Sequence, residues 1–210
     1  MDWIFANATI FNSDLSSWDV SNVTSMVAAF SHTQFNQNIS SWDVSNVINM
    51  EALFRETPFN QDLSGWDVSN VQNISHMFSN ATMFNQNISQ WNTSSVLNMG
   101  YMFSNATLFN QDISAWYTNN VTNMEYMFSD AITFDQDLSS WNVNNLLDME
   151  NIFQNANSLS DGNKCAIHSV WGSNIYWPYS NWEEICVYRS CKPTNLTVEI
   201  GENRNVIMWN

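Results

Sequence analysis

The chain has 210 residues, 44% of them apolar, so it is long enough and apolar enough to bury the core of one ordinary domain. Only five lysines and arginines stand against 20 aspartates and glutamates, and this net charge of −15 excludes nucleic acid as a partner, because little here could neutralise phosphates. No apolar run approaches the roughly 18 residues of a membrane-spanning helix, so no membrane span is expected.

A repeat begins at Met1 and continues to about position 155, with a period of about 25 residues, which is typical of stacked arrays. Tryptophan recurs at one position of this repeat, and phenylalanine recurs at two others in the same register. A unit this small cannot bury its apolar side alone, so stacked units must share one core. The residues expected to form the columns of that core are Trp18, Trp42, Trp66, Trp91, Trp116 and Trp141, with Phe11, Phe35, Phe59, Phe84, Phe109 and Phe134.

Each unit contains two kinds of apolar pattern. Within 99–106, apolar residues fall at i, i+3, i+4 and i+7, which is typical of a two-turn helix. Between Ile113 and Val121 the spacing is shorter and suits a short strand followed by a tight turn. The sequence therefore predicts an α/β repeat solenoid, right-handed, with one short strand and one short helix per coil, and with six coils over residues 1–148.

A polar column accompanies the aromatic ones. Small amide and hydroxyl side chains at one repeat position can bond the backbone of a neighbouring coil at each bend. The members of this column are Asn22, Asn46, Asn70, Ser95, Asn120 and Asn145.

The composition changes after Phe153. We expect residues 149–191 to hold a partial seventh coil and a C-terminal cap, with a helix over 162–171 that Asp161 N-caps and a second short segment near 182–187. Residues 192–210 have a strand-like pattern, so they form either an added hairpin or the start of a following domain.

All three cysteines lie in the expected cap, which suggests one disulfide with one thiol left over. A bond between Cys165 and Cys186 is favoured, because both lie in segments that must pack together to close the cap. A bond between Cys186 and Cys191 is the alternative. A zinc site with His168 is disfavoured, because the chain has no Cys-x-x-Cys pair.

One repeat position alternates between aspartate and asparagine. Such side chains cap turns within a coil, whereas carboxylates stacked about 5 Å apart on adjacent coils could instead hold calcium. Turn capping is the preferred interpretation, and no other cofactor is expected. The four aspartates at this position are Asp14, Asp62, Asp112 and Asp137.

Asn-x-Ser/Thr sequons are frequent because the repeat is rich in asparagine and serine. In a secretory pathway some of them could carry N-linked glycans. The candidates that look most exposed are Asn80, Asn105 and Asn195.

Catalysis finds little support. The three histidines are far apart in the sequence and have no recurring serine or cysteine partner. Glycoside hydrolysis needs two carboxylates at a set separation, and nothing here singles out one pair. We therefore expect no catalytic residues and no enzymatic activity.

The unit Phe-Asn-Gln-Asp-Leu-Ser-x-Trp-Asp-Val-Ser-Asn-Val-x-x-Met resembles the repeat of BspA-like surface proteins, which also occurs in mycoplasma lipoproteins and in algal and giant-virus proteins. Clear copies lie at 35–50, 59–74 and 134–149. The resemblance implies a leucine-rich-repeat-like solenoid on secreted or cell-surface proteins, linked with adhesion and protein binding and without catalytic residues.

We therefore expect a non-enzymatic extracellular protein, associated with a cell envelope or virion, that presents a regular face for recognition of a protein or glycan. The alternative is a structural subunit of a surface appendage, envelope or virion, assembled through packing of solenoids, so that the partner is another copy. The sequence specifies neither the ligand nor the face that binds it.

Overall fold

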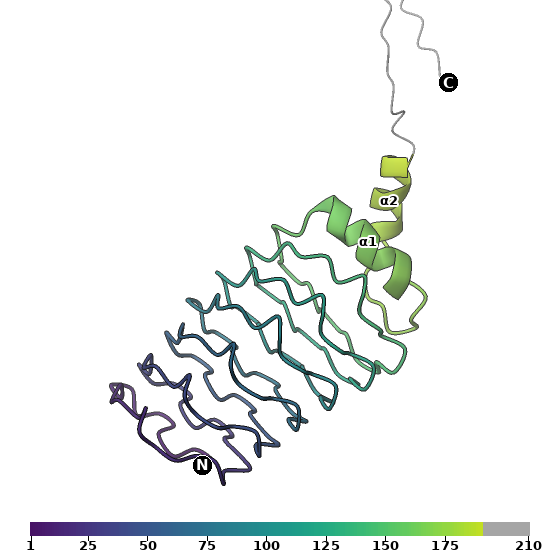
Figure 1. The fold of residues 1–210 in the computed structure, drawn as a ribbon. Coiled ribbons are helices and arrows are strands. Elements are labelled where there is room, and N and C mark those ends of the chain that lie inside the picture. Colours follow the sequence, from purple (N-terminus) through teal and green to yellow (C-terminus); the bar gives the residue numbers. More distant parts are fainter. Residues whose placement is uncertain (191–210) are drawn as a thin grey trace, which may run out of the picture.

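The computed structural model describes residues 1–190 of the chain, with side chains through residue 187. The backbone forms a series of coils that stack along one axis, and two helices close the end opposite the N-terminus (Figure 1). These helices are α1, Asp161–Trp171, and α2, Trp182–Ser190, and no other helix occurs among the described residues.

The predicted right-handed α/β solenoid, with its leucine-rich-repeat-like strand and helix in every coil, is wrong. The coils consist of turns and extended segments, and both helices belong to the cap. Neighbouring coils meet at isolated parallel bridges, one residue per coil, so the described part of the chain contains no sheet. The bridges join Ser25, Asn49, Asn73, Asn98, Asn123 and Asp148 in succession.

Two residues in every coil stop the predicted helix from forming. In the coil that begins at Met99, Tyr101 has a φ of 58° and Asn105 a φ of 55°, both in the left-handed region that an α-helix cannot contain. Some N–H groups of this segment bond within the coil, and others bond the next coil. That of Met102 bonds the Met99 carbonyl at 3.2 Å, whereas that of Tyr101 bonds the Glu125 carbonyl of the next coil at 2.8 Å. A helix would have used these donors within its own coil and left the coils unconnected.

The apolar residues nevertheless point inward and form continuous aromatic stacks. Phe103 lies 3.8 Å from Phe109 in the same coil and 5.7 Å from Phe128 in the next, measured between ring centroids. Trp116 stacks on Trp141 at 6.2 Å. Among the twelve aromatic residues of the expected core, ten are buried, while Phe11 is partly buried and Trp18 is 39% exposed.

Side chains connect the coils where the backbones do not. The Nε1–H of Trp116 donates to the Ile88 carbonyl of the preceding coil at 3.0 Å. The Asn120 amide donates to the Ser94 carbonyl at 2.8 Å, so the polar column bonds the neighbouring backbone as predicted. A second polar row uses an asparagine oxygen as a double acceptor: Asn85 Oδ1 receives both the N–H of Asn110 and the amide of Gln111, each at 3.0 Å.

The two units that are one residue shorter replace the missing residue with a threonine hydroxyl. In the first, Thr33 Oγ1 donates to the Phe30 carbonyl at 2.7 Å and accepts the N–H of Phe35 at 3.2 Å. Thr57 makes the same pair of contacts in the second. The shorter turn therefore brings the second phenylalanine column back into register.

The cap continues the columns of the last coil with residues from outside the repeat. Trp171 of α1 stacks on Trp141 at 6.1 Å, so it extends the tryptophan column. The Tyr179 hydroxyl accepts the N–H of Phe153 at 2.9 Å, a bond that the carbonyl of a following coil makes elsewhere. Burial raises the pKa of this hydroxyl to about 12. Tyr179 therefore satisfies an N–H group that an open end would leave without its partner.

One detail of the cap differs from the prediction. The N-cap of α1 is Ser160, whose Oγ accepts the N–H of Asn163, and Asp161 is the first helical residue. Asp161 instead places its negative charge in the first turn, where it interacts favourably with the helix dipole. The strand-like pattern of 192–210 falls outside the described residues.

Candidate functional site

In three consecutive coils the first left-handed position holds an aromatic ring that is partly exposed. His76 stacks on Tyr101 at 4.6 Å with planes 10° apart, and Tyr101 stacks on Tyr126 at 4.9 Å with planes 8° apart. All three side chains are half-buried. We call these three residues the aromatic ladder. The other residues at this position are Trp3, Ala28, Ala52 and Asn151.

The backbone conformation does not favour tyrosine at this position. A left-handed φ costs about 1–2 kcal/mol for a residue with a Cβ, and asparagine tolerates it best among non-glycine residues. Asn151 holds the position in the coil that follows Tyr126. The φ values of 58° at Tyr101 and 50° at Tyr126 are therefore maintained against local preference. The same conformation recurs at this position in every coil, so it belongs to the repeat, and the stacked aromatic rings are what distinguish these three coils.

Carboxylates flank the tyrosine end of the ladder. The Asn151 amide donates both to the Tyr126 hydroxyl at 2.7 Å and to Glu150 Oε1 at 3.1 Å, so it joins the two side chains. Glu125, one residue before Tyr126, accepts the Asn123 amide at 3.2 Å. Burial, followed by the negative charge of Glu125, raises the pKa of Tyr101. The Tyr101 hydroxyl therefore stays protonated at neutral pH.

The histidine end of the ladder has a different charge. Burial, followed by the positive charge of Arg55, lowers the pKa of His76, so this imidazole is neutral at pH 7. Arg55 pairs with Glu56 at 3.4 Å, and the same carboxylate lies 3.0 Å from the imidazole of His32. The guanidinium of Arg55 thus lies at the histidine end of the ladder and is paired there.

The aspartates considered for calcium act as turn acceptors. Asp112 Oδ1 accepts the N–H of Ser114 at 2.9 Å, and Asn87 makes the equivalent bond to Ser89 at 2.9 Å. Asp14, Asp62 and Asp137 accept from the serine two residues on in the same way. Among residues 1–187, no three side chains of the metal-binding types His, Cys, Asp and Glu come together as a candidate site. These hydrogen bonds are the ones expected if the aspartates cap turns within each coil.

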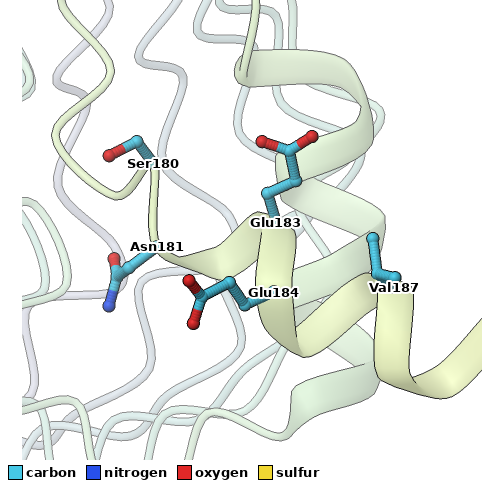
Figure 2. Close-up of a pocket in the computed structure, with 5 residues that line it drawn as sticks. All are labelled: Ser180, Asn181, Glu183, Glu184 and Val187. Carbon is cyan, nitrogen blue, oxygen red and sulfur yellow. The ribbon is translucent and has the colours of Figure 1, made fainter.

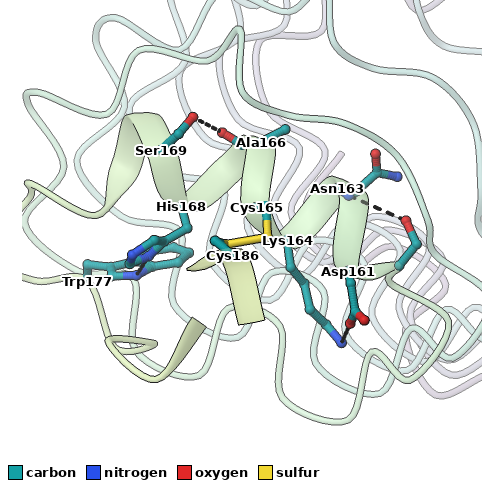
Figure 3. The surroundings of a disulfide bond; sticks show 10 residues. Asp161, Asn163, Lys164, Cys165, Ala166, His168, Ser169, Trp177 and Cys186 are labelled. Carbon is teal, nitrogen blue, oxygen red and sulfur yellow. Dashed lines mark hydrogen bonds and ion pairs between the residues drawn. A yellow bond between two sulfur atoms is a disulfide. The ribbon is translucent and has the colours of Figure 1, made fainter. Parts of the chain in front are cut away.

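A disulfide joins the two helices of the cap. Cys165 of α1 bonds Cys186 of α2, with their Cα atoms 5.2 Å apart (Figure 3). This is the first of the two pairings expected from the sequence, and it leaves no Cys186 thiol for Cys191, which lies outside the described residues. His168 accepts the Nε1–H of Trp177 at its Nδ1 atom, 3.0 Å away, and so belongs to the packing of the cap.

Two of the expected glycosylation sites have their amides engaged. The Asn105 amide donates to Asn80 Oδ1 at 2.8 Å, and the Asn80 amide donates to Ser79 Oγ at 3.2 Å. Both asparagines are half-buried. Asn195 lies outside the described residues.

A surface depression lies beside α2 and is not an enclosed cavity. Its volume is about 700 Å³, and it is lined by Ser180, Asn181, Glu183, Glu184 and Val187. Figure 2 shows the two glutamates of the first turn pointing to different sides, so they do not converge on one ligand position. We therefore place the candidate site at the aromatic ladder.

Sequence reasoning missed the aromatic ladder, although a signal for it was present. His76, Tyr101 and Tyr126 follow one another at intervals of one full repeat, so they share one repeat position. The position was overlooked because it varies among the coils, while attention went to the columns that repeat. In an array whose constant positions build the core, the surface positions that vary are the ones available for binding.

Comparison with known proteins gives one family. Residues 1–88 and residues 55–166 match the model of DUF285, described as a Mycoplasma protein of unknown function. No curated protein and no solved structure matches the chain. No helix among residues 1–190 is long and apolar enough to cross a membrane.

Proposed function

The chain belongs to the DUF285 family, and we propose that it is a non-enzymatic recognition protein of the BspA-like kind, which binds a protein or glycan through the surface that carries the aromatic ladder. We place it outside the cell or on a cell or virion surface. The disulfide between α1 and α2 supports this location, because such bonds persist in oxidising compartments.

The observation that carries the proposal is the pair of stacked, partly exposed tyrosines. Tyr101 and Tyr126 stack with planes 8° apart and are not among the buried residues of the core. Tyrosines are enriched at binding interfaces, because they offer a large rigid contact area together with a hydroxyl. Stacking fixes these side chains before a ligand arrives, which lowers the entropy lost on binding.

The proposal can be tested on an array of immobilised synthetic peptides and neutral oligosaccharides. The test variant is Tyr101→Asn with Tyr126→Asn, which introduces the residue that the next coil has at this position. The control is Tyr117→Asp, because Tyr117 is 61% exposed and aspartate occupies its repeat position in three other coils.

We expect the wild-type chain to bind members of the array, the double variant to lose that binding by about tenfold or more, and the control to retain it. Binding by the double variant at the wild-type level would show that the ladder is not the recognition surface. Circular dichroism on all three proteins establishes that the fold is unchanged.

The alternative function, a structural subunit built from copies of this chain, is supported by apolar surface where the cap meets the last coil. Leu147 is 61% exposed and Ile175 is 88% exposed, and both line a groove of about 380 Å³. Sedimentation equilibrium at high concentration tests this alternative. Reversible association that Ile175→Ser abolishes would support it, and a monomer at every concentration would reject it.

A further inference from the structure

The aromatic ladder presents ring edges and hydroxyl groups to a ligand. Both faces of the Tyr101 ring are covered, by His76 at 4.6 Å on one side and Tyr126 at 4.9 Å on the other. A sugar that stacks on an aromatic side chain needs an open ring face. Tyr101 can therefore meet a ligand through its edge and its hydroxyl oxygen and not through a ring face.

The oxygens around the two tyrosines are mainly hydrogen-bond acceptors. Carboxylates of Glu125 and Glu150 stand in adjacent coils beside the rings, and their charges act on the Tyr101 hydroxyl. Asp130 follows on the same coil as Tyr126, where its two oxygens accept from Ser129 and from the Asn155 amide. A ligand that meets these groups must supply donors and, in such a negative field, positive charge.

The repeat coils provide almost no positive charge of their own. Arg55 is the only lysine or arginine in residues 1–163, and it is paired with Glu56 at the opposite end of the ladder. The carboxylates beside Tyr101 and Tyr126 therefore have only amide and hydroxyl partners among the contacts described above. The complementary surface is one that carries lysine or arginine.

We propose that the tyrosine end of the aromatic ladder binds a lysine- or arginine-bearing segment of a protein partner, with the cationic groups seated between Glu125 and Glu150 and against the tyrosine hydroxyls. This inference rests on the proposed function and specifies its ligand. The tyrosines position the contact, and the two glutamates select for charge.

The test uses a fluorescein-labelled peptide of twelve residues in which arginine alternates with serine. Peptides of alternating glutamate and serine, and of alternating glutamine and serine, serve as probes of opposite and zero charge. Binding is followed by fluorescence anisotropy against the whole chain. The test variant is Glu125→Gln with Glu150→Gln, since glutamine keeps an oxygen to accept from Asn123 and Asn151.

A matched control removes the same charge elsewhere. Glu183→Gln with Glu184→Gln changes two exposed glutamates at the start of α2 and gives the same net charge as the test variant. We expect the Glu125 and Glu150 variant to weaken binding of the arginine peptide about tenfold and the α2 variant to weaken it less than twofold. Equal losses would show attraction by net charge alone and would overturn the inference, as would no loss in either.

The tyrosine variant of the preceding section separates the two proposals. If it loses ligand while the Glu125 and Glu150 variant does not, the ladder is a recognition surface but its partner is not cationic. Preferential binding of a neutral oligosaccharide over the arginine peptide leads to that same conclusion. If neither variant changes the binding of any probe, both proposals fall.

Discussion

Replacing Trp116 with phenylalanine should lower the free energy of unfolding by about 3 kcal/mol, whereas the same change at Trp18 should cost about 1 kcal/mol. The two residues occupy the same column and differ in their surroundings. Trp116 is 4% exposed and bonds the preceding coil, while Trp18 is 39% exposed in the first coil. The same substitution is thus compared at a buried tryptophan and at a partly exposed one.

The magnitude has two parts. Loss of the Nε1–H bond to the Ile88 carbonyl costs about 1 kcal/mol, because that carbonyl retains the N–H of Trp91 at 3.2 Å and is not orphaned. Phenylalanine is also about three heavy atoms smaller than tryptophan, which removes about 2 kcal/mol of buried contact at about 0.8 kcal/mol for each methylene-sized group. At Trp18 no earlier coil supplies an acceptor among the described residues, and part of the ring is already in water.

Urea denaturation gives the measurement. With a slope of about 2 kcal/mol per molar urea, the Trp116 variant should shift the midpoint by about 1.5 M and the Trp18 variant by about 0.5 M. Because repeat arrays can unfold in parts, amide exchange over residues 99–123 should accompany the midpoint. Equal shifts for the two variants would refute the reasoning, since they would mean that coil-to-coil packing adds nothing to the tryptophan column.

Three further predictions concern the cap, the left-handed positions and the turn aspartates. Replacing Cys165 and Cys186 with serine opens a loop whose ends are 21 residues apart, and it should lower the free energy of unfolding by about 3 kcal/mol. Amide exchange should then rise over 160–187 and stay unchanged in the coils. Unchanged exchange in the cap would contradict this prediction. Tyr101→Val should be less stable than Tyr101→Asn by about 1–2 kcal/mol, because a β-branched residue is poorly tolerated at a φ of 58°; equal melting temperatures would exclude the strain. Hydrogen bonds from the side chain and backbone of Ser114 lower the pKa of Asp112. The stability that this carboxylate contributes is therefore present above the unfolded pKa of about 3.9, and it is lost as pH falls through the lower folded pKa. Asp112→Asn should therefore reduce the fall in urea midpoint below about pH 4, and an unaltered pH profile would count against the bond.

The core and the coil boundaries could be read from the sequence because each repeats in register. Phe103 and its counterparts from Phe30 to Phe153 are buried for the same reason, so their column is visible without a structure. The conformation between these residues could not be read in that way. The spacing of Met99, Met102, Phe103 and Ala106 fits one face of a helix, yet the same spacing serves a chain of turns that places all four inward.

The backbone conformation of a repeat unit depends on hydrogen bonds to the next unit. The Tyr101 N–H finds its acceptor in the Glu125 carbonyl, which belongs to the next coil, and only the stack of coils makes that bond available. Apolar periodicity reports which side of a segment is buried, and it does not report where the backbone donors go. The shared repeat position of His76, Tyr101 and Tyr126 was visible in the sequence, whereas their stacking required the structure.

Several contacts between the cap and the last coil reproduce contacts that each coil makes with its successor. Trp171, the Tyr179 hydroxyl and Asn163 take the places of a tryptophan, a carbonyl and a glutamine amide. These three contacts reach only Asp135, Trp141 and Phe153, so the cap does not depend on the number of coils before them. Gain or loss of one whole repeat unit, as copying errors produce in repetitive genes, would leave the join intact and alter only the reach of the molecule. Evolution can therefore adjust the length of the stack in steps of one coil.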